Sequence, residues 1–300
     1  MTRIPTQTAH KVMQHAMETN FAKLADAQRQ LSSGKRLTKV SDAPGAAIAV
    51  NRLRAKESMA GAFISAADDG LSMLSAQDSS LQDASSILNR VRELVVSGTS
   101  RLQNPQVRAA IATELESLRD QMVAVANTQY AGRSVFGGFS ATAVQNTGGS
   151  VSWVGDSNTV DRRVSPELIV SVSSNGEQVF GFDAGSPAGS DNVFTVINRA
   201  AAAIRSATPE DARVELDKIE DRMMSVSSAL ASVGGRVNQI EMVQSQAEDS
   251  IVAMRTSRSL LEDVDMGEAV VNLRDAEAAY QATLAVVARL HSTSLLDFLR

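Results

Sequence analysis

Apolar residues recur at alternating steps of three and four along both ends of the chain. This spacing puts the apolar side chains on one side of a helix and is typical of helices that pair as in a coiled coil. It predicts a helix over about residues 8–32. It also predicts a last helix, which is expected to begin after Asp263-Val264-Asp265 because acidic residues favour a helix N-terminus. The N-terminal seam is defined as Met13, Met17, Phe21, Leu24 and Leu31, and the C-terminal seam as Val270, Leu273, Tyr280, Leu284, Val287, Leu295 and Phe298.

Long helices are predicted between these ends. Pro44 suits the first turn of a helix, Ser41 and Asp42 before it are suitable N-cap residues, and the next proline is at position 105. A helix from residue 44 to about 97 would be roughly 80 Å long at 1.5 Å per residue, so an elongated molecule is expected. After a short break Pro105 begins another helix, and such a short connection favours antiparallel neighbours.

Helical patterns return in the second half of the chain. They cover about residues 191–206 and then a long run from Thr208-Pro209-Glu210 to about residue 258. Because kinks often occur at small residues such as glycine, Gly234-Gly235 is predicted to interrupt and bend the long run.

The segment between about residues 128 and 190 has a different composition. Glycine is frequent, five of the eight Phe lie between residues 136 and 194, and the single Trp is Trp153. Asn175-Gly176 is predicted to form the turn of a β-hairpin, since Asn-Gly is a strong signal for such turns. Strands are predicted at residues 151–154, 159–164, 168–172 and 178–182.

These elements predict a mainly α fold. It would be an elongated antiparallel helical bundle or coiled coil, built from the N- and C-terminal segments, with a small β-rich outer domain inserted between them. The predicted domains are terminal helices at 1–42 and 259–300, a long-helix bundle at 43–130 and 191–258, and a β-rich insert at 131–190.

The two ends also differ in charge. Residues 1–40 contain seven Lys or Arg against two Asp or Glu, whereas residues 259–300 contain three Arg against seven Asp or Glu. This difference suggests that the chain folds back and brings the two terminal helices together. Exposed ion pairs contribute only about 0–1 kcal/mol each, so the apolar seams are expected to supply affinity and the charges to supply register.

Composition excludes several classes of function. The net charge of −5 argues against a sequence-independent grip on nucleic acid, which needs a basic face. The absence of cysteine excludes disulfides, thiolate metal sites and cysteine catalysis. No membrane insertion is expected, because no run of about 18 apolar residues occurs. No secretory signal is evident either, so these features alone would indicate a cytoplasmic protein.

No motif in the sequence predicts catalysis, a cofactor or a metal site. His10 and His15 are five residues apart, which puts them on different faces of a helix, and His291 lies beside the C-terminal seam. Gly34-Lys35 lacks the rest of a phosphate-binding loop and follows a helix instead of a strand. The acidic pairs Asp68-Asp69 and Glu262-Asp263 are interpreted as solvated helix surface.

A family resemblance is carried by the residues around the first predicted break. Gln30-Leu31-Ser32-Ser33-Gly34-Lys35-Arg36-Leu37, followed by residues 40–49, resembles the N-terminal signature of the bacterial flagellin family, in which one helix ends at a corner and a long helix begins. Asp263-Val264-Asp265-Met266 and the residues through Leu295-Leu296 resemble the C-terminal pattern, so the resemblance covers about the first 135 and last 100 residues. The corner motif is Ser33, Gly34, Lys35, Arg36, Asp42 and Pro44.

Two kinds of family member remain open. Asp42-Ala43-Pro44, the aromatic-Gly-Gly step within residues 127–139 and the ending at residues 294–299 are similar to the hook-associated members. Residues 45–49 are closer to filament flagellins. The sequence favours a hook-associated member, with filament flagellin as the alternative and an unrelated elongated binding module, such as an adhesin or chaperone, as a more distant one.

The resemblance implies a structural subunit and not an enzyme. It implies an adaptor at the hook–filament junction of the bacterial flagellum, exported through the flagellar type III apparatus without a cleaved signal peptide, so the expected location becomes extracellular. The implied partners are like subunits in a ring, the proximal hook-associated protein, flagellin, and an export chaperone at the C-terminal segment. Residues 1–40 and 259–300 are expected to be mobile in the free monomer and to order on assembly, because isolated helices need packing.

Overall fold

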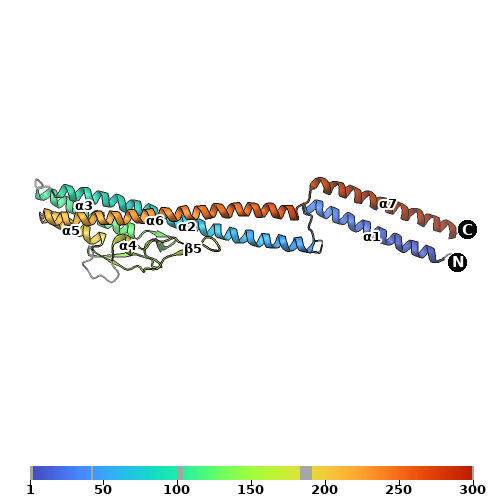
Figure 1. Ribbon diagram of the computed structural model, residues 1–300, viewed down its shortest axis with the longest axis horizontal. Helices are drawn as coiled ribbons and strands as arrows, with labels where there is room; N and C mark the ends of the chain where they lie inside the picture. Colours follow the sequence, from blue (N-terminus) through green and yellow to red (C-terminus); the bar gives the residue numbers. More distant parts are fainter. Residues whose placement is uncertain (1–2, 42, 100–103, 183–190, 299–300) are drawn as a thin grey trace. The chain divides into compact units, whose positions relative to one another are not determined.

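The computed structural model describes residues 3–41, 43–99, 104–182 and 191–298. Near the ends of the outermost helices, the side chains of residues 3–7, 9, 10 and 290–298 are outside the description. Asp42, and the side chains of Leu295 and Phe298, therefore lie outside the described residues, as do those of His10 and His291. The elements are α1 (Arg3–Ser33), α2 (Pro44–Gly98), α3 (Pro105–Ala126), β1 (Gln129–Tyr130), β2 (Arg133–Ser134), β3 (Val144–Thr147), β4 (Ser150–Trp153), β5 (Asp161–Arg163), β6 (Ile169–Ser171), α4 (Gly176–Phe180), α5 (Val193–Arg205), α6 (Pro209–Glu262) and α7 (Met266–Phe298) (Figure 1).

The mainly α fold with a small antiparallel β portion is confirmed. The chain forms two compact units, one made of residues 1–59 with 250–300 and the other of residues 60–249. The long helices α2 and α6 contribute residues to both units. The division into three parts, with boundaries near residues 42, 130, 190 and 258, stays a prediction.

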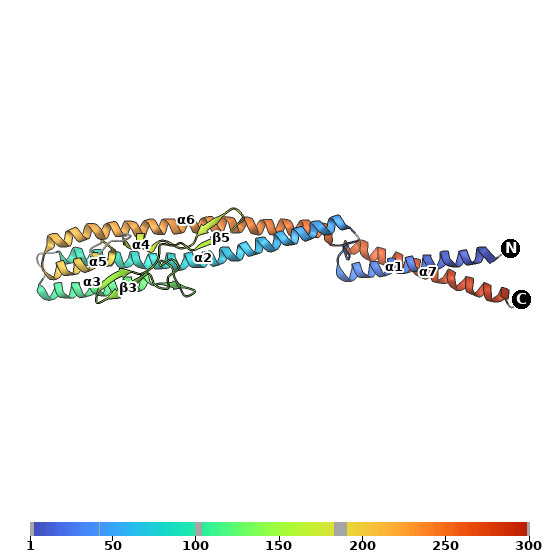
Figure 2. The same ribbon diagram turned by 90° about the horizontal axis from the view of Figure 1, so that it is seen from below.

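The core of residues 60–249 lies among α2, α3, α5 and α6, which run side by side in two perpendicular views (Figures 1 and 2). The side chain of Asn104 accepts a hydrogen bond from the Val107 amide and caps α3, which begins at Pro105 as predicted. Asn192 caps α5 in the same way, through the Thr195 amide. Buried residues at helical spacing then fill the core, among them Leu74, Leu81, Leu88, Leu115, Met122, Ile197, Ile204 and Ile219.

The β portion consists of three antiparallel two-stranded hairpins, β1–β2, β3–β4 and β5–β6. Strands β4, β5 and β6 confirm the predicted strands at 151–154, 159–164 and 168–172. Strand β3 was not predicted, because only Val144 among its four residues is apolar and buried. It pairs with β4 across the tight turn at Gly148-Gly149.

The predicted strand at 178–182 is wrong, and so is the Asn175-Gly176 hairpin turn. Gly176–Phe180 form α4, and the Asn175 side chain accepts a hydrogen bond from the Glu177 amide at 2.9 Å, as an N-cap does. Gly176 is needed for close packing, since an added Cβ would lie 2.7 Å from Cβ of Phe136. Phe180 of α4 packs edge-on against Phe136, with ring centroids 5.2 Å apart. Asn therefore acts here as a helix cap.

The predicted interruption at Gly234-Gly235 is also wrong. Helix α6 continues through both glycines, and no atom lies within 4 Å of a Cβ added at either one. The flanking residues Val233 and Ile240 are fully buried on the core side. Packing of that side holds the helix continuous, while the glycines lie on its open side.

Candidate assembly site

The terminal helices α1 and α7 lie side by side and run in opposite directions (Figures 1 and 2). Nδ2 of Asn20 donates a hydrogen bond of 2.7 Å to Oγ1 of Thr283. One residue along α1, the ring of Phe21 lies 5.8 Å from the ring of Tyr280. Residues of the two seams therefore meet across this helix pair.

Local signals set the facing ends of the two helices. The carboxylate of Asp265 accepts hydrogen bonds from the amides of Gly267 at 2.8 Å and Glu268 at 3.3 Å, which caps the N-terminus of α7. Helix α1 ends at Ser33, and Gly34 follows with a φ of 67°, a left-handed conformation that favours glycine. The Asp265 cap lies where the sequence predicts the start of the last helix, and Gly34 lies in the corner motif.

The pairing of α1 with α7 leaves much of both seams in contact with solvent. Among the described side chains of this pair, the apolar ones that are buried are the small ones of Ala27 and Ala269. Phe21 remains 57% exposed, Leu284 40% and Val270 37%. The other described seam residues are partly buried, namely Met13, Met17, Leu24, Leu31, Leu273, Tyr280 and Val287.

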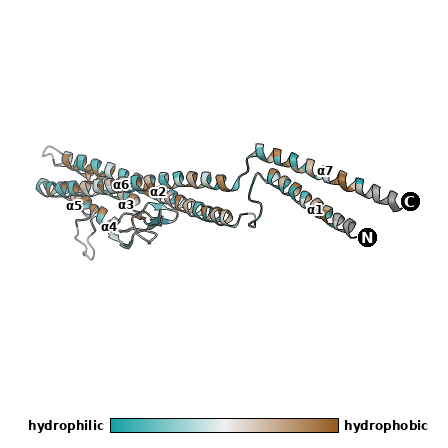
Figure 3. Ribbon diagram, turned by 45° about the vertical axis from the view of Figure 1, so that its right-hand side comes forward, coloured by the Kyte–Doolittle hydropathy of each residue, from teal (hydrophilic) through white to brown (hydrophobic). Residues whose placement is uncertain are grey.

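Further apolar side chains lie outside the seams. Val12 on α1 and Val271 and Val286 on α7 are exposed. Figure 3 shows these helices carrying hydrophobic positions between hydrophilic ones along their length. Exposed apolar surface of this extent is a feature of interaction sites, because burying it in a second contact is favourable.

The opposite charges of α1 and α7 are not neutralised by pairing along the helices. Lys23 and Asp275 line the same groove between α1 and α7, together with Asn20, Ala27 and Ala276. Among the described side chains no ion pair joins α1 to α7 along this groove. Within this groove the side chains of Lys23 and Asp275 are both exposed.

The first four residues of the corner motif come together with the link between α6 and α7. The Arg36 amide donates to the Glu262 carbonyl at 2.7 Å, and the Val264 amide donates to the Gly34 carbonyl at 3.0 Å. Lys35 and Asp263 form an isolated antiparallel bridge, and the Lys35 amide donates to Oγ of Ser33. Pro44 lies at the start of α2 and is exposed, while Asp42 is outside the described residues.

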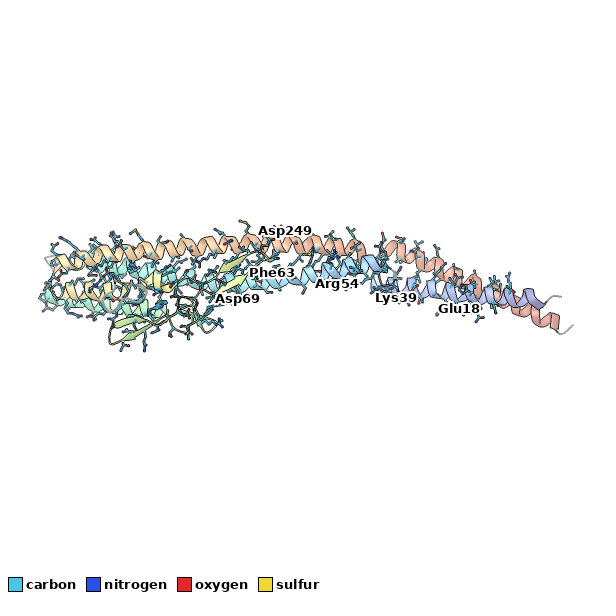
Figure 4. All side chains as sticks on the ribbon, turned by 60° about the horizontal axis from the view of Figure 1, so that its bottom comes forward. Glu18, Lys39, Arg54, Phe63, Asp69 and Asp249 are labelled. Carbon is cyan, nitrogen blue, oxygen red and sulfur yellow. The ribbon has the colours of Figure 1, made fainter. Side chains whose placement is uncertain are left out.

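Glu262 is not a solvated surface residue, which corrects the interpretation of the Glu262-Asp263 pair. Its side chain is only 5% exposed. Its carboxylate accepts a hydrogen bond of 2.5 Å from Nζ of Lys35 and another from the guanidinium of Arg54, which Figure 4 labels on α2. Arg258, one turn earlier on α6, lies 3.5 Å away. Asp69 of the other acidic pair is likewise engaged, at 2.7 Å from Nε of Arg162.

Electrostatics keep the Glu262 carboxylate ionised. Burial acts to raise its pKa, but the hydrogen bond from Lys35 and the charges of Lys35 and Arg54 outweigh burial, so the pKa is lowered. Glu57 on α2 is bound by Arg255 at 2.5 Å and by Arg258 at 3.5 Å, and the hydrogen bond from Arg255 is the main cause of its lowered pKa. The charged cluster is defined as Lys35, Arg54, Glu57, Arg255, Arg258 and Glu262.

Metal sites and membrane-spanning helices are both absent from the described residues. No group of three His, Cys, Asp or Glu side chains there is arranged to hold a metal ion. Within the same part of the chain, every helix is too short or too polar to cross a membrane.

Comparison with known families identifies this architecture. The model for the bacterial flagellin N-terminal helical region matches residues 4–141, and the model for the bacterial flagellin C-terminal helical region matches residues 216–299. The chain belongs to the bacterial flagellin family. The matched regions include α1, α7 and all members of the charged cluster.

The chain is similar both to hook-associated proteins and to flagellins. Flagellar hook-associated protein 3 of Salmonella typhimurium is 25% identical over 99% of this chain and 100% of that protein. A flagellin of Halalkalibacterium halodurans is 22% identical over 95% of this chain and 93% of that protein. The crystal structure of flagellar hook-associated protein 3 from Legionella pneumophila has the same fold, with a TM-score of 0.63 at 17% identity, over 71% of this chain and 98% of that one.

Proposed function

We propose that this flagellin-family chain is a structural adaptor subunit at the junction between the hook and the filament of the bacterial flagellum. The observation that carries the proposal is the exposed apolar surface that remains on α1 and α7 after they pair, as at Phe21 and Leu284. If α1 and α7 paired only with each other, this apolar surface would stay exposed to water. Similarity to hook-associated protein 3 over 98–99% of this chain, against 95% for the flagellin, favours the junction over the filament.

The subunits assemble through the seams. Copies of the chain form a ring in which residues 1–42 and 259–300 make the inner core, residues 43–130 and 191–258 a surrounding layer, and residues 131–190 an outer domain. One side of the ring contacts the proximal hook-associated protein and the other contacts flagellin. An export chaperone holds the C-terminal segment before secretion through the flagellar apparatus to the extracellular side.

Location within the flagellum tests this function. A fluorescently labelled chain, produced in a flagellated strain that lacks its own junction protein, should appear as a short band between hook and filament and should restore swimming. Label along the whole filament, or polymerisation of the purified chain alone into long filaments, would instead support filament flagellin. A stable monodisperse oligomer of purified protein would contradict both assignments.

Hydrogen exchange tests how the terminal helices order. In dilute monomer, amides of residues 1–40 and 259–300 are expected to exchange quickly, because a helix pair with half-exposed seams has little packing to hold it. The same amides should become protected in the assembled state. Slow exchange of both segments in dilute monomer would contradict this part of the proposal.

A further inference from the structure

The apolar seams by themselves do not specify one alignment of α1 against α7. Met17, Leu24 and Leu31 are spaced by seven residues on α1, and so are Leu273, Tyr280 and Val287 on α7. Sliding one helix by seven residues, which is close to two turns, brings one apolar seam residue to the place of another. The observed register therefore needs an additional determinant.

Glu262 is placed to supply it. Its carboxylate binds Lys35 in the corner after α1, Arg54 in the first turns of α2 and Arg258 in its own helix α6. Its carbonyl oxygen also accepts the hydrogen bond from the Arg36 amide. One residue thus joins the corner after α1 to the end of α6, directly before the link that leads into α7.

Burial makes this contact selective. The carboxylate is withdrawn from solvent, whereas Lys35 and Arg54 each retain more than 40% of their side-chain exposure. The cations can be solvated in other arrangements, but the carboxylate loses Lys35 if the corner moves by seven residues and is left to rely on Arg258 of its own helix, 3.5 Å away. A buried ionised carboxylate that loses a charge-assisted hydrogen bond is unfavourable, so slipped registers are penalised.

We propose that Glu262 is a positioning residue that fixes the register of α1 against α7 within a single chain. Asn20 then meets Thr283, and Phe21 meets Tyr280, because the corner has aligned the helices. Lys35 and Glu262 thus let opposite charges from the two ends of the chain act on register at the corner. The inference concerns how α1 and α7 are aligned whenever they pair within one chain, and it does not depend on the proposed function.

Cysteine cross-linking measures the register directly, because the full chain contains no cysteine. Asn20→Cys with Thr283→Cys reports the observed register, and Asn20→Cys with Ala276→Cys reports a slip of seven residues. A short bifunctional thiol reagent is added to dilute protein, and intramolecular products are resolved on a denaturing gel. Replacing Asn20 also removes the polar contact to Thr283, so the assay isolates the contribution of the corner.

Each pair is then combined with Glu262→Gln. We expect the ratio of observed-register to slipped product to fall roughly tenfold, since the variant removes charge-assisted hydrogen bonds. Asp263→Asn is the matched control, because it neutralises the adjacent carboxylate, which is exposed; it should leave the ratio unchanged. Lys35→Met, which leaves Glu262 with Arg54 and Arg258, should lower the ratio by less than Glu262→Gln does.

Three results would overturn the proposal. An unchanged ratio in Glu262→Gln would show that register is set elsewhere. An equal change in Asp263→Asn would show a general effect of charge. Loss of both products in Glu262→Gln and in Lys35→Met would show that the cluster holds the helices together without choosing among registers.

Discussion

Phe21 of α1 and Tyr280 of α7 face each other with ring centroids 5.8 Å apart and planes inclined by 51°. Tilted aromatic pairs of this kind contribute about 0.5–1.5 kcal/mol beyond the area they bury. Yet Phe21 keeps more than half of its surface in solvent. The intramolecular pair therefore leaves much of Phe21 uncovered, and under the proposed function a neighbouring subunit would cover it.

Leu284→Asp is expected to abolish assembly while leaving secretion largely intact. Leu284 is 40% exposed in the monomer, so the carboxylate stays solvated there. In an assembled seam it would be buried without a partner, at a cost of roughly 3–5 kcal/mol per subunit. Sedimentation of assembled material and the amount of protein in the culture medium measure the two effects.

Ala278→Asp is the control for this substitution. Ala278 is exposed on α7 and lies six residues before Leu284, about 120° around the helix from it by the 3.6-residue repeat. The same charge placed there should leave assembly much closer to that of the unchanged chain. Equal loss in both variants would argue that α7 tolerates no added charge and that the seam is not special.

Gly34→Ala is expected to loosen the corner. At a φ of 67° an alanine is disfavoured by about 1 kcal/mol, although an added Cβ would meet no atom within 4 Å. In the assembled state, where these segments are expected to be protected, the amides of Arg36 and Val264, which bond across the corner, should then exchange roughly fivefold faster with deuterium. Gly45→Ala, also open to solvent but inside α2, should leave these exchange rates unchanged.

Acid is expected to weaken the charged cluster through Glu262. Because the folded-state pKa of Glu262 is lowered from its ordinary value of 4.5, its contribution to the free energy of unfolding is complete above that value. It is lost as the pH falls through the lowered pKa. The difference in thermal stability between the unchanged chain and Glu262→Gln should be constant from pH 6 to 8 and should shrink in acid; a difference that grew below pH 4 would contradict this sign.

The elements that could be predicted from sequence are those set by neighbouring residues. Pro44, Pro105 and the Asp265 cap mark helix starts that the structure confirms. The Asn175-Gly176 signal misled because one dipeptide suits both a hairpin turn and a helix cap, and the choice between them depends on packing against Phe136. Local pattern could not supply that contact.

The charged cluster could not be predicted for a different reason. Lys35 and Arg54 lie 227 and 208 residues from Glu262 along the chain, so only the folded corner brings them together. The local signals were the spacing of Arg258 and Glu262, four residues apart on α6, and that of Arg54 and Glu57, three residues apart on α2. The periodicity of the two seams, in contrast, could be recognised from the sequence. Which seam residues stay exposed could not, because that depends on the partner helix.

Two glycine substitutions should have opposite effects on the unit formed by residues 60–249. Gly176→Ala puts a methyl group 2.7 Å from Cβ of Phe136 and 2.8 Å from the ring of Trp153, so it should lower the free energy of unfolding by about 1–3 kcal/mol through overpacking. Gly234→Ala adds a methyl group with no neighbour within 4 Å inside the continuous helix α6, and should raise that free energy by up to about 1 kcal/mol. Denaturant unfolding followed by the fluorescence of Trp153 measures both. A destabilised Gly234→Ala variant would mean that the glycine pair allows a bend that the continuous helix does not display.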